Sequence, residues 1–254
     1  PSRGWNFPAW SLSMEWLAYL FFPLLVLVLW RVRDRLPPAA LALIAFLCLT
    51  PLLYIGFTRD NDPFLVQGWA STIRIATEFT AGSFTYLAVR RWQDSAGAKR
   101  SAHVLAWVLP ILIVVIAVVM GNIPGLQWEG LPDEAPRGYV VIIPLLVLWL
   151  GALALSTGAP SRFLSTHTLV LGGFISYSLY LIHIVWYGLW RAGMQFIGID
   201  GGPIYLLSTI FLIVSTVGWA YLMWRFVEEP AREWMRSKAG ARKVPTEEAG
   251  EQAR

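Results

Sequence analysis

The residues most able to do chemistry lie inside long apolar runs, and the first of them is Glu15. It stands near the start of a run that continues to Trp30, which approaches the roughly 20 residues that cross a bilayer. At a helical repeat of about 3.6 residues, one stripe of that helix collects Ser11, Glu15, Tyr19 and Phe22. An ionisable group at that depth costs about 2.5–3.5 kcal/mol, so it normally faces a protein interior or a wet cavity. The stripe predicts a functional carboxylate in a membrane site; alternatively, Glu15 stays solvated at the interface or neutralises an arginine for packing.

A second charged pair is Arg74 and Glu78, four residues apart in an apolar segment. This spacing allows the two side chains to pair on one helix face. An arginine inside a membrane is suited to hold a phosphate or a carboxylate through its planar set of donors. The alternative interpretation is an ion pair that only helps helices to pack.

A third polar stripe falls in the sequence ISYSLYLIHIVWY. Four side chains project within an arc of about 60° on a helix: Ser176, Tyr180, His183 and Tyr187. Histidine transfers protons near neutral pH, so this stripe predicts a substrate-lining or catalytic role. A lone histidine on an apolar face is more often a satisfied core residue, which remains the competing interpretation.

Several familiar motifs are absent from the sequence. There is no CxxC pair and no HExxH, so we expect no metal, and no glycine-rich phosphate loop or GxSxG motif occurs. The single Cys48 cannot form an intramolecular disulfide. Glu228 and Glu229, before Pro230, are interpreted as a solvated helix end.

The composition indicates what must position these groups. Of the 254 residues 56% are hydrophobic and 14% are charged, with a mean hydropathy of +0.55, whereas soluble domains carry about 25% charged residues. The net charge is only +4 and the basic residues form short clusters between apolar runs. That pattern indicates membrane topology and headgroup contact rather than nucleic-acid binding.

The fold class predicted is therefore all-α, a polytopic membrane helical bundle. We expect about seven spans, at residues 12–30, 38–57, 70–92, 104–121, 139–156, 171–190 and 205–226. They would form one membrane domain over residues 1–236, followed by a disordered cytoplasmic tail at 237–254.

The loops predict the orientation. Basic residues gather at 31–35, 90–100, around Arg162 and at 232–243, whereas the alternating loops 58–67 and 121–138 are poor in them. By the positive-inside rule the basic set is cytoplasmic. Residue 1 is then outside and the C-terminus inside, as an odd number of spans requires.

Four stretches in series resemble the acyltransferase 3 family of bacterial membrane O-acyltransferases. They are NFPAWSLSME with the following Tyr and FP at residues 6–23, the R…F-x-x-G…Y segment at 74–86, ISYSLYLIH at 175–183, and VEEP at 227–230. The four blocks occur in the family's order.

The resemblance implies a ten-helix enzyme of the bacterial cytoplasmic (inner) membrane that moves an acyl group, usually acetyl from acetyl-CoA, to a hydroxyl of a carbohydrate. The partners implied are acyl-CoA, a carbohydrate acceptor and the lipid bilayer, with no permanently bound cofactor. Because the chain starts at Pro1 without Met and with an outside end, we interpret it as a fragment that lacks three helices. The family's Arg and His on its first helix would lie in the missing part, so we expect the fragment to be inactive alone.

The roles expected from this resemblance divide the polar residues into two groups. Glu15, Arg74 and His183 are the catalytic candidates: Glu15 would orient the missing His or the acceptor, and Arg74 would stabilise negative charge on the donor. The substrate-binding candidates are Asn6, Trp10 and Ser11 at the outer mouth, and Ser176 and Tyr180 along the channel.

Other classes remain open. A secondary transporter or flippase also carries intramembrane Arg, Glu and His, although no internal repeat is evident. The membrane-bound O-acyltransferases use an embedded His as well, but the WSLSME and SYSLYLIH blocks argue against them. A purely structural subunit fits three separate polar stripes least well.

Overall fold

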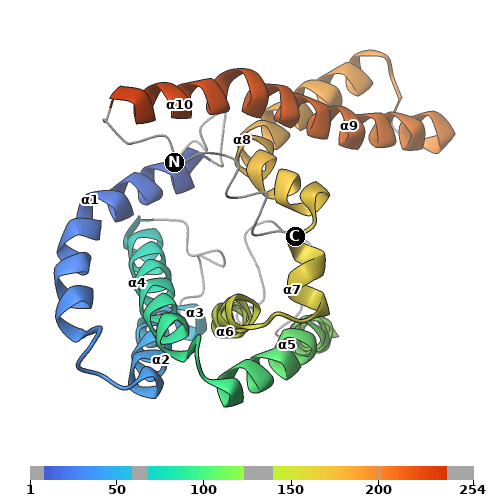
Figure 1. Ribbon diagram of the computed structural model, residues 1–254. Helices are drawn as coiled ribbons and strands as arrows, with labels where there is room; N and C mark the ends of the chain where they lie inside the picture. Colours follow the sequence, from blue (N-terminus) through green and yellow to red (C-terminus); the bar gives the residue numbers. More distant parts are fainter. Residues whose placement is uncertain (1–8, 59–67, 123–139, 200, 239–254) are drawn as a thin grey trace. The chain divides into compact units, whose positions relative to one another are not determined.

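The computed structural model describes residues 9–58, 68–122, 140–199 and 201–238, and regular structure in this part of the chain is helical throughout (Figure 1). The chain divides into two compact units: an N-terminal unit, Ala9–Thr166, and a C-terminal unit that begins at His167. Each unit is described by itself below.

The N-terminal unit holds seven α-helices within the described residues: α1 Ala9–Val32, α2 Pro38–Leu47, α3 Thr50–Thr58, α4 Gly68–Trp92, α5 Ala96–Asn122, α6 Ile142–Leu155 and α7 Ala159–Leu164. The C-terminal unit holds α8 His167–Phe196, α9 Gly202–Met223, a π-helical turn η2 at Trp224–Glu228, and α10 Glu229–Lys238. The all-α prediction is confirmed for the described residues.

Within the described residues, five stretches are long and apolar enough to cross a membrane: Ser11–Val32, Pro38–Gly56, Ala96–Val119, His167–Phe196 and Gly202–Lys238. They coincide with five of the seven predicted spans, so the chain is a multi-pass membrane protein. The predicted span 70–92 is the 25-residue α4, which has sufficient length but carries several charged side chains. The predicted span 139–156 contains α6, which has only 14 residues. The total of seven spans, and the ten-helix fold, remain predictions, and most of the predicted tail lies outside the described residues.

The core of the N-terminal unit forms where small and large apolar side chains alternate along neighbouring helices. Leu41 and Ala45 on α2 are buried against Phe84, Leu87 and Ala88 on α4. Their spacing of three or four residues places each set on one helix face. The core therefore fixes α4 against α2, and α4 also packs on α1 and α6.

A second interface of this unit, between α5 and α6, also combines small and large apolar side chains. Ala102 and Leu109 on α5 are buried against Ala152 on α6. Small side chains at such an interface let two helices approach closely. Close approach increases the van der Waals contact that helps to hold helices together in a bilayer.

At two of the prolines in the apolar helices, the carbonyl that loses its usual amide donor receives another donor. Pro51 cannot donate to the carbonyl of Leu47, and the Thr50 hydroxyl donates to it instead at 2.8 Å, where α2 gives way to α3. Pro110, inside α5, cannot donate to the carbonyl of Ala106. The indole Nε1 of Trp149 on α6 donates to this carbonyl at 3.2 Å. Backbone groups in hydrocarbon have no water to bind, so these replacements stabilise the breaks.

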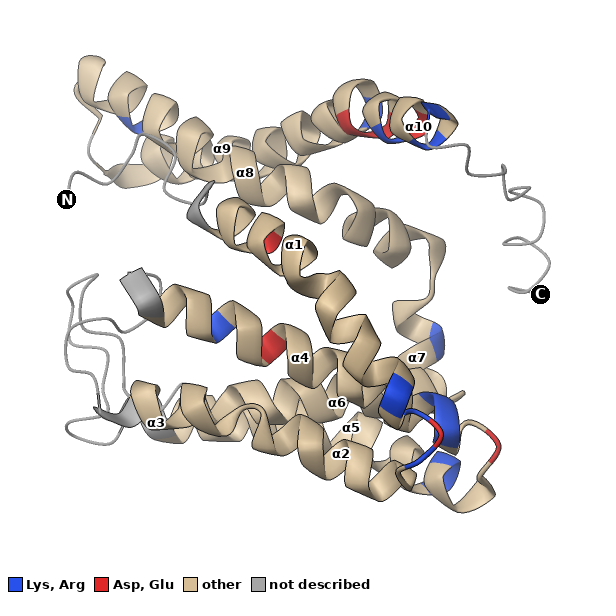
Figure 2. Cartoon of the chain, turned by 90° about the vertical axis from the view of Figure 1, so that its left-hand side faces the viewer, with Lys and Arg blue, Asp and Glu red and all other residues tan. Residues whose placement is uncertain are grey.

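The basic segments at the C-terminal ends of α1 and α4 meet at one end of the unit. Arg91 Nη1 donates to the carbonyl of Arg33 at 2.9 Å, and Arg33 Nε pairs with Asp34 at 2.8 Å. Figure 2 shows Lys and Arg positions gathered at this end. The arrangement is the one that the predicted topology requires, because residues 31–35 and 90–100 must share a side of the membrane.

In the C-terminal unit, α8 packs lengthwise on α9, and Trp186 Nε1 on α8 donates to Ser215 Oγ on α9 at 2.8 Å. The helix continues from α9 into the wider π-helical turn η2 just before Pro230. In this turn the amide of Glu229 donates to the carbonyl of Trp224, five residues earlier. Proline has no N–H and its ring clashes with the carbonyl four residues back, so the wider turn accommodates it.

The Trp149 contact makes a prediction for stability. Trp149→Phe leaves the Ala106 carbonyl without that donor, and we expect it to lower the free energy of unfolding by about 1–2 kcal/mol. Pro110→Ala returns an amide donor to the same carbonyl, so Trp149→Phe should cost clearly less in that background. Unfolding of the four proteins in mixed detergent micelles completes the cycle. An equal cost of Trp149→Phe in both backgrounds would contradict the proposed role of the indole.

Candidate functional site

The carboxylate of Glu15 is half-buried on α1 and is held by the next turn of the same helix. The hydroxyl of Tyr19 donates to Glu15 Oε1 at 2.5 Å. Ser11, one turn before Glu15, is also half-buried. The stripe predicted from the sequence is thus present. Within it the Tyr19 phenol donates a short hydrogen bond to the Glu15 carboxylate, and such a bond is stronger when the carboxylate is ionised.

The predicted pair on α4 is also formed. Arg74 Nε lies 3.1 Å from Glu78 Oε1, and the two side chains are 29% and 28% exposed. Of the five N–H donors of the guanidinium, Nε makes this bond to Glu78.

The contacts between α1 and α4 determine how Glu15 on α1 lies along the helix axes relative to Arg74 and Glu78 on α4. Thr72 Oγ1 on α4 lies 3.9 Å from Met14 Sδ on α1, and the rings of Phe22 and Phe79 meet edge to face at 5.6 Å. Both residue numbers increase from the first contact to the second, so the two helices run parallel. Glu15 and the Arg74–Glu78 pair both lie between these two contacts. Figure 2 shows the two helices side by side, with coloured charged positions in their N-terminal halves.

The predicted stripe on α8 lines a groove against α9. The groove has a volume of about 570 Å³, and its wall contains Ser176, Tyr180, His183 and Tyr187 from α8 and Thr216 from α9. The rings of Tyr180 and His183 are 5.8 Å apart. All four side chains of the predicted stripe therefore face one space.

The hydrogen bond of His183 fixes its tautomer. Nδ1 lies 2.7 Å from the carbonyl oxygen of Tyr180. A carbonyl oxygen only accepts, so Nδ1 must carry the proton. In the neutral ring Nε2 then holds the lone pair, which can accept a hydrogen bond or a proton from a ligand in the groove.

The structure thus groups the predicted residues into two sets. Glu15 and Arg74, with Ser11, belong to the N-terminal unit, and Ser176, Tyr180 and His183 belong to the C-terminal unit. Asn6 lies outside the described residues, and so does the side chain of Trp10, whose backbone is in α1. The catalytic and binding roles of all eight residues remain predictions.

One polar contact was missed by the sequence analysis. Ser178, which is buried on α8, donates to Glu228 Oε2 at 2.9 Å across 50 residues of sequence. Glu229 pairs with Arg232 in the first turn of α10. The two glutamates are half-buried, bonded groups rather than the freely solvated helix end expected from the sequence. The helical repeat of a single segment gives no signal for the Ser178–Glu228 contact, because the two residues lie on different elements.

Metal binding finds no support in the described part of the chain, where no group of three or more His, Cys, Asp or Glu side chains could hold an ion. The chemistry available there is that of carboxylates, a guanidinium, an imidazole and phenols. Such groups transfer protons and stabilise oxyanions.

A chain whose described residues are helical, with five stretches long and apolar enough to cross a bilayer, belongs to the class of multi-pass membrane proteins. Residues 2–225 match the family model of the acyltransferase 3 domain, and the chain belongs to that family. This match confirms the resemblance found in the sequence motifs. No curated relative and no solved structure matches the chain.

The histidine tautomer leads to a prediction for activity. His183→Ala should lower acyl transfer by the whole protein at least tenfold, since it removes the Nε2 lone pair from the groove. The matched control is His167→Ala, which changes an exposed histidine at the start of the same helix. Transfer is measured in membranes after normalisation to the amount of protein. A loss of protein without a loss of activity per molecule would return His183 to a packing role.

Proposed function

We propose that the protein is a membrane O-acyltransferase that moves an acyl group, acetyl in the first instance, from acyl-CoA to a hydroxyl of a cell-envelope or exported carbohydrate. The family assignment over residues 2–225 carries the acyltransferase class. The acyl donor and the carbohydrate acceptor are part of the proposal, supported by the polar residues inside the spans.

The reaction balances without a redox partner or a metal. The acceptor hydroxyl attacks the thioester carbonyl, a C–O bond forms and the C–S bond breaks. The hydroxyl proton is removed and finally returns to the CoA thiolate. Such a reaction needs a group that takes the proton and donors that hold the negative oxygen of the tetrahedral intermediate.

In the N-terminal unit, Arg74 is proposed to stabilise the negative charge that develops on the donor. Its side chain is half-buried and pairs with Glu78. A charge held in such a low-dielectric site interacts more strongly than it would in water. Glu15, held by Tyr19 at the same level of α1, is proposed to orient the acceptor or the proton-accepting histidine that the family resemblance implies.

In the C-terminal unit, the groove between α8 and α9 is proposed to receive the acceptor. His183 Nε2 would accept a hydrogen bond from the hydroxyl that is acylated. Tyr180 offers an aromatic face to the sugar ring, and Ser176 lies one turn before it in the same groove.

The experiment that tests the function uses the protein as its gene encodes it, in membrane vesicles, with radiolabelled acetyl-CoA and a cell-envelope extract. We expect label in an alkali-labile carbohydrate ester, above the level of vesicles without the protein. CoA release at background with every extract, together with proton-dependent flux of a sugar, would replace the proposal by a transporter.

Two substitutions test the proposed roles in the same assay. Glu15→Gln keeps the size of the side chain and removes its charge, whereas Arg74→Gln removes the guanidinium and shortens the side chain. We expect each to lower transfer at least a hundredfold. The matched controls are Glu233→Gln and Arg236→Gln, both at exposed positions of α10. Wild-type rates for both Glu15→Gln and Arg74→Gln would show that the site lies elsewhere.

The proposed orientation has its own test. After Cys48, the only cysteine, is replaced by Ala, a new cysteine is introduced by Lys99→Cys at the basic end of the N-terminal unit. An impermeant thiol reagent should label it only in broken cells, because this end is predicted to face the cytoplasm. Labelling in intact cells would invert the orientation.

A further inference from the structure

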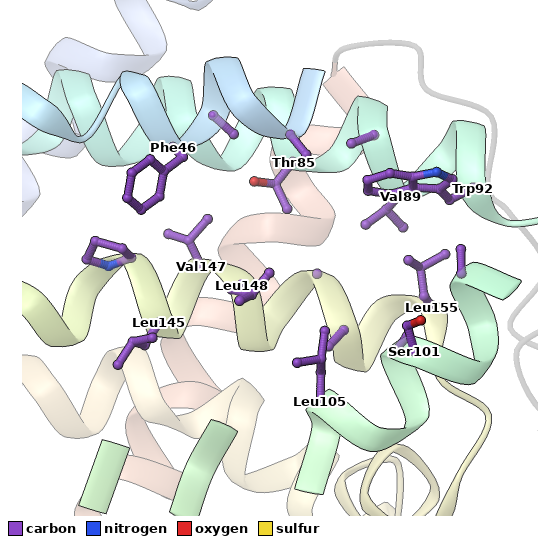
Figure 3. A pocket seen from close by; sticks show the side chains of 18 of the residues that line it. Phe46, Thr85, Val89, Trp92, Ser101, Leu105, Leu145, Val147, Leu148 and Leu155 are labelled. Carbon is purple, nitrogen blue, oxygen red and sulfur yellow. The ribbon is translucent and has the colours of Figure 1, made fainter. Parts of the chain in front are cut away.

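One feature of the N-terminal unit without an assigned role is a cavity of about 470 Å³ between α2, α4, α5 and α6 (Figure 3). Phe46 from α2 and Val147 from α6 project toward its interior, and Trp92 from α4 and Leu155 from α6 stand near its other end. The cavity contains none of the residues to which a catalytic role is assigned.

The cavity is elongated and apolar. Its wall on α6 extends from Pro144 to Leu155, which corresponds to about 16 Å of helix at 1.5 Å per residue. The hydroxyl of Thr85 in the wall already donates to the carbonyl of Ala81 at 2.8 Å. The hollow exists because the wall is built largely of small residues, such as Ala102 on α5 and Ala152 on α6.

The side chains that line an unfilled apolar space of this size lose van der Waals contacts, and water inside it would find few hydrogen-bond partners. A hydrocarbon chain restores those contacts. The shape and lining therefore favour a single alkyl chain over a compact polar ligand.

The end of the cavity near Trp92 and Ser95 is rich in positive charge. Arg90 and Arg91 precede these residues on α4, and Lys99 and Arg100 follow them as exposed side chains in the first turns of α5. Figure 2 shows that the basic positions of the unit are concentrated at this end. A phosphate held here would sit beside several cations at the depth where lipid headgroups lie.

We propose that this cavity binds one acyl chain of an anionic phospholipid, with the phosphate of the lipid held at the basic end by Lys99 and Arg100. The lipid is a resident component of the N-terminal unit. It fills the space between the α2–α4 pair and the α5–α6 pair.

The geometry separates this lipid from the acyl donor. Trp92 stands 18 residues after Arg74 on one continuous helix, a distance of about 27 Å along its axis. A chain that entered from the basic end would leave its head group, and any thioester, that far from the Arg74–Glu78 pair. The proposal therefore does not rest on the proposed function.

The test measures lipid binding by the purified whole protein in detergent micelles, using native mass spectrometry. The probes are phosphatidylglycerol and phosphatidylcholine with identical acyl chains. We expect one lipid that survives detergent exchange, with at least a fivefold preference for phosphatidylglycerol. Equal retention of the two lipids, or retention of neither, would overturn the proposal.

Two sets of variants separate the chain from the head group. Val147→Phe fills the cavity and should weaken phosphatidylglycerol binding at least fivefold, whereas Val114→Phe, at a 61% exposed position of α5, should not change it. The double variant Lys99→Gln, Arg100→Gln changes only exposed side chains and so preserves packing. It should remove the preference for phosphatidylglycerol while leaving the bound chain in place.

Three results would overturn the assignment. They are undiminished binding to folded Val147→Phe, an unchanged lipid preference in the Lys99→Gln, Arg100→Gln variant, and displacement of the resident lipid by equimolar palmitoyl-CoA with acylation of an acceptor. The last result would make the cavity a donor site.

Discussion

Every backbone polar group that lies in hydrocarbon has to find its partner within the protein, and this constraint governs the helices described here. It is most visible at the prolines. The carbonyl released by Pro51 is taken by a hydroxyl in the same turn, and the one released by Pro110 by an indole from a neighbouring helix. At Pro230 the helix widens by one residue instead. Three different solutions meet the same requirement, and each leaves a local change of helix direction or diameter.

These local solutions decide where the helices can pack, and packing decides where the charges lie. The Trp149 bond ties α6 to α5, and α6 in turn packs on α4. The position of α4 then fixes the level of Arg74 and Glu78 relative to Glu15, through the Phe22–Phe79 contact with α1. The relative positions of these charged residues therefore depend on side chains of neighbouring helices, such as Trp149 on α6.

Local spacing made much of this predictable. The helical repeat predicted that Arg74 and Glu78 can pair, and this contact is present. It placed Glu15 and Tyr19 on one stripe, and the structure adds the hydrogen bond between them. The polar face of α8 also followed from the helical repeat and lines one groove. The C-terminal end of α6 also agrees with the predicted span 139–156, because the helix ends at Leu155 and the chain leaves it through Ser156.

Contacts between helices could not be predicted from the sequence. Ser178 and Glu228 are separated by 50 residues, and Trp149 and Ala106 by 43. Each contact depends on the rotation of two helices about their own axes and on the angle at which they cross. The helical repeat of a single segment contains neither quantity, so the partners appear only when the helices are placed together. The register of α1 against α4 is unpredictable for the same reason, whereas their parallel direction follows from the predicted topology.

The π turn at Trp224–Glu228 also sets the direction in which the side chains of α10 point around the helix axis. A turn with one extra residue advances the side chains of α10 by about 100° relative to an uninterrupted helix. The orientation in which Arg232, Trp234 and Arg236 leave α9 is therefore set by a single inserted position. Loss of one residue from this turn would leave every side chain of α10 in place along the sequence and turn all of them together by about 100° about the helix axis.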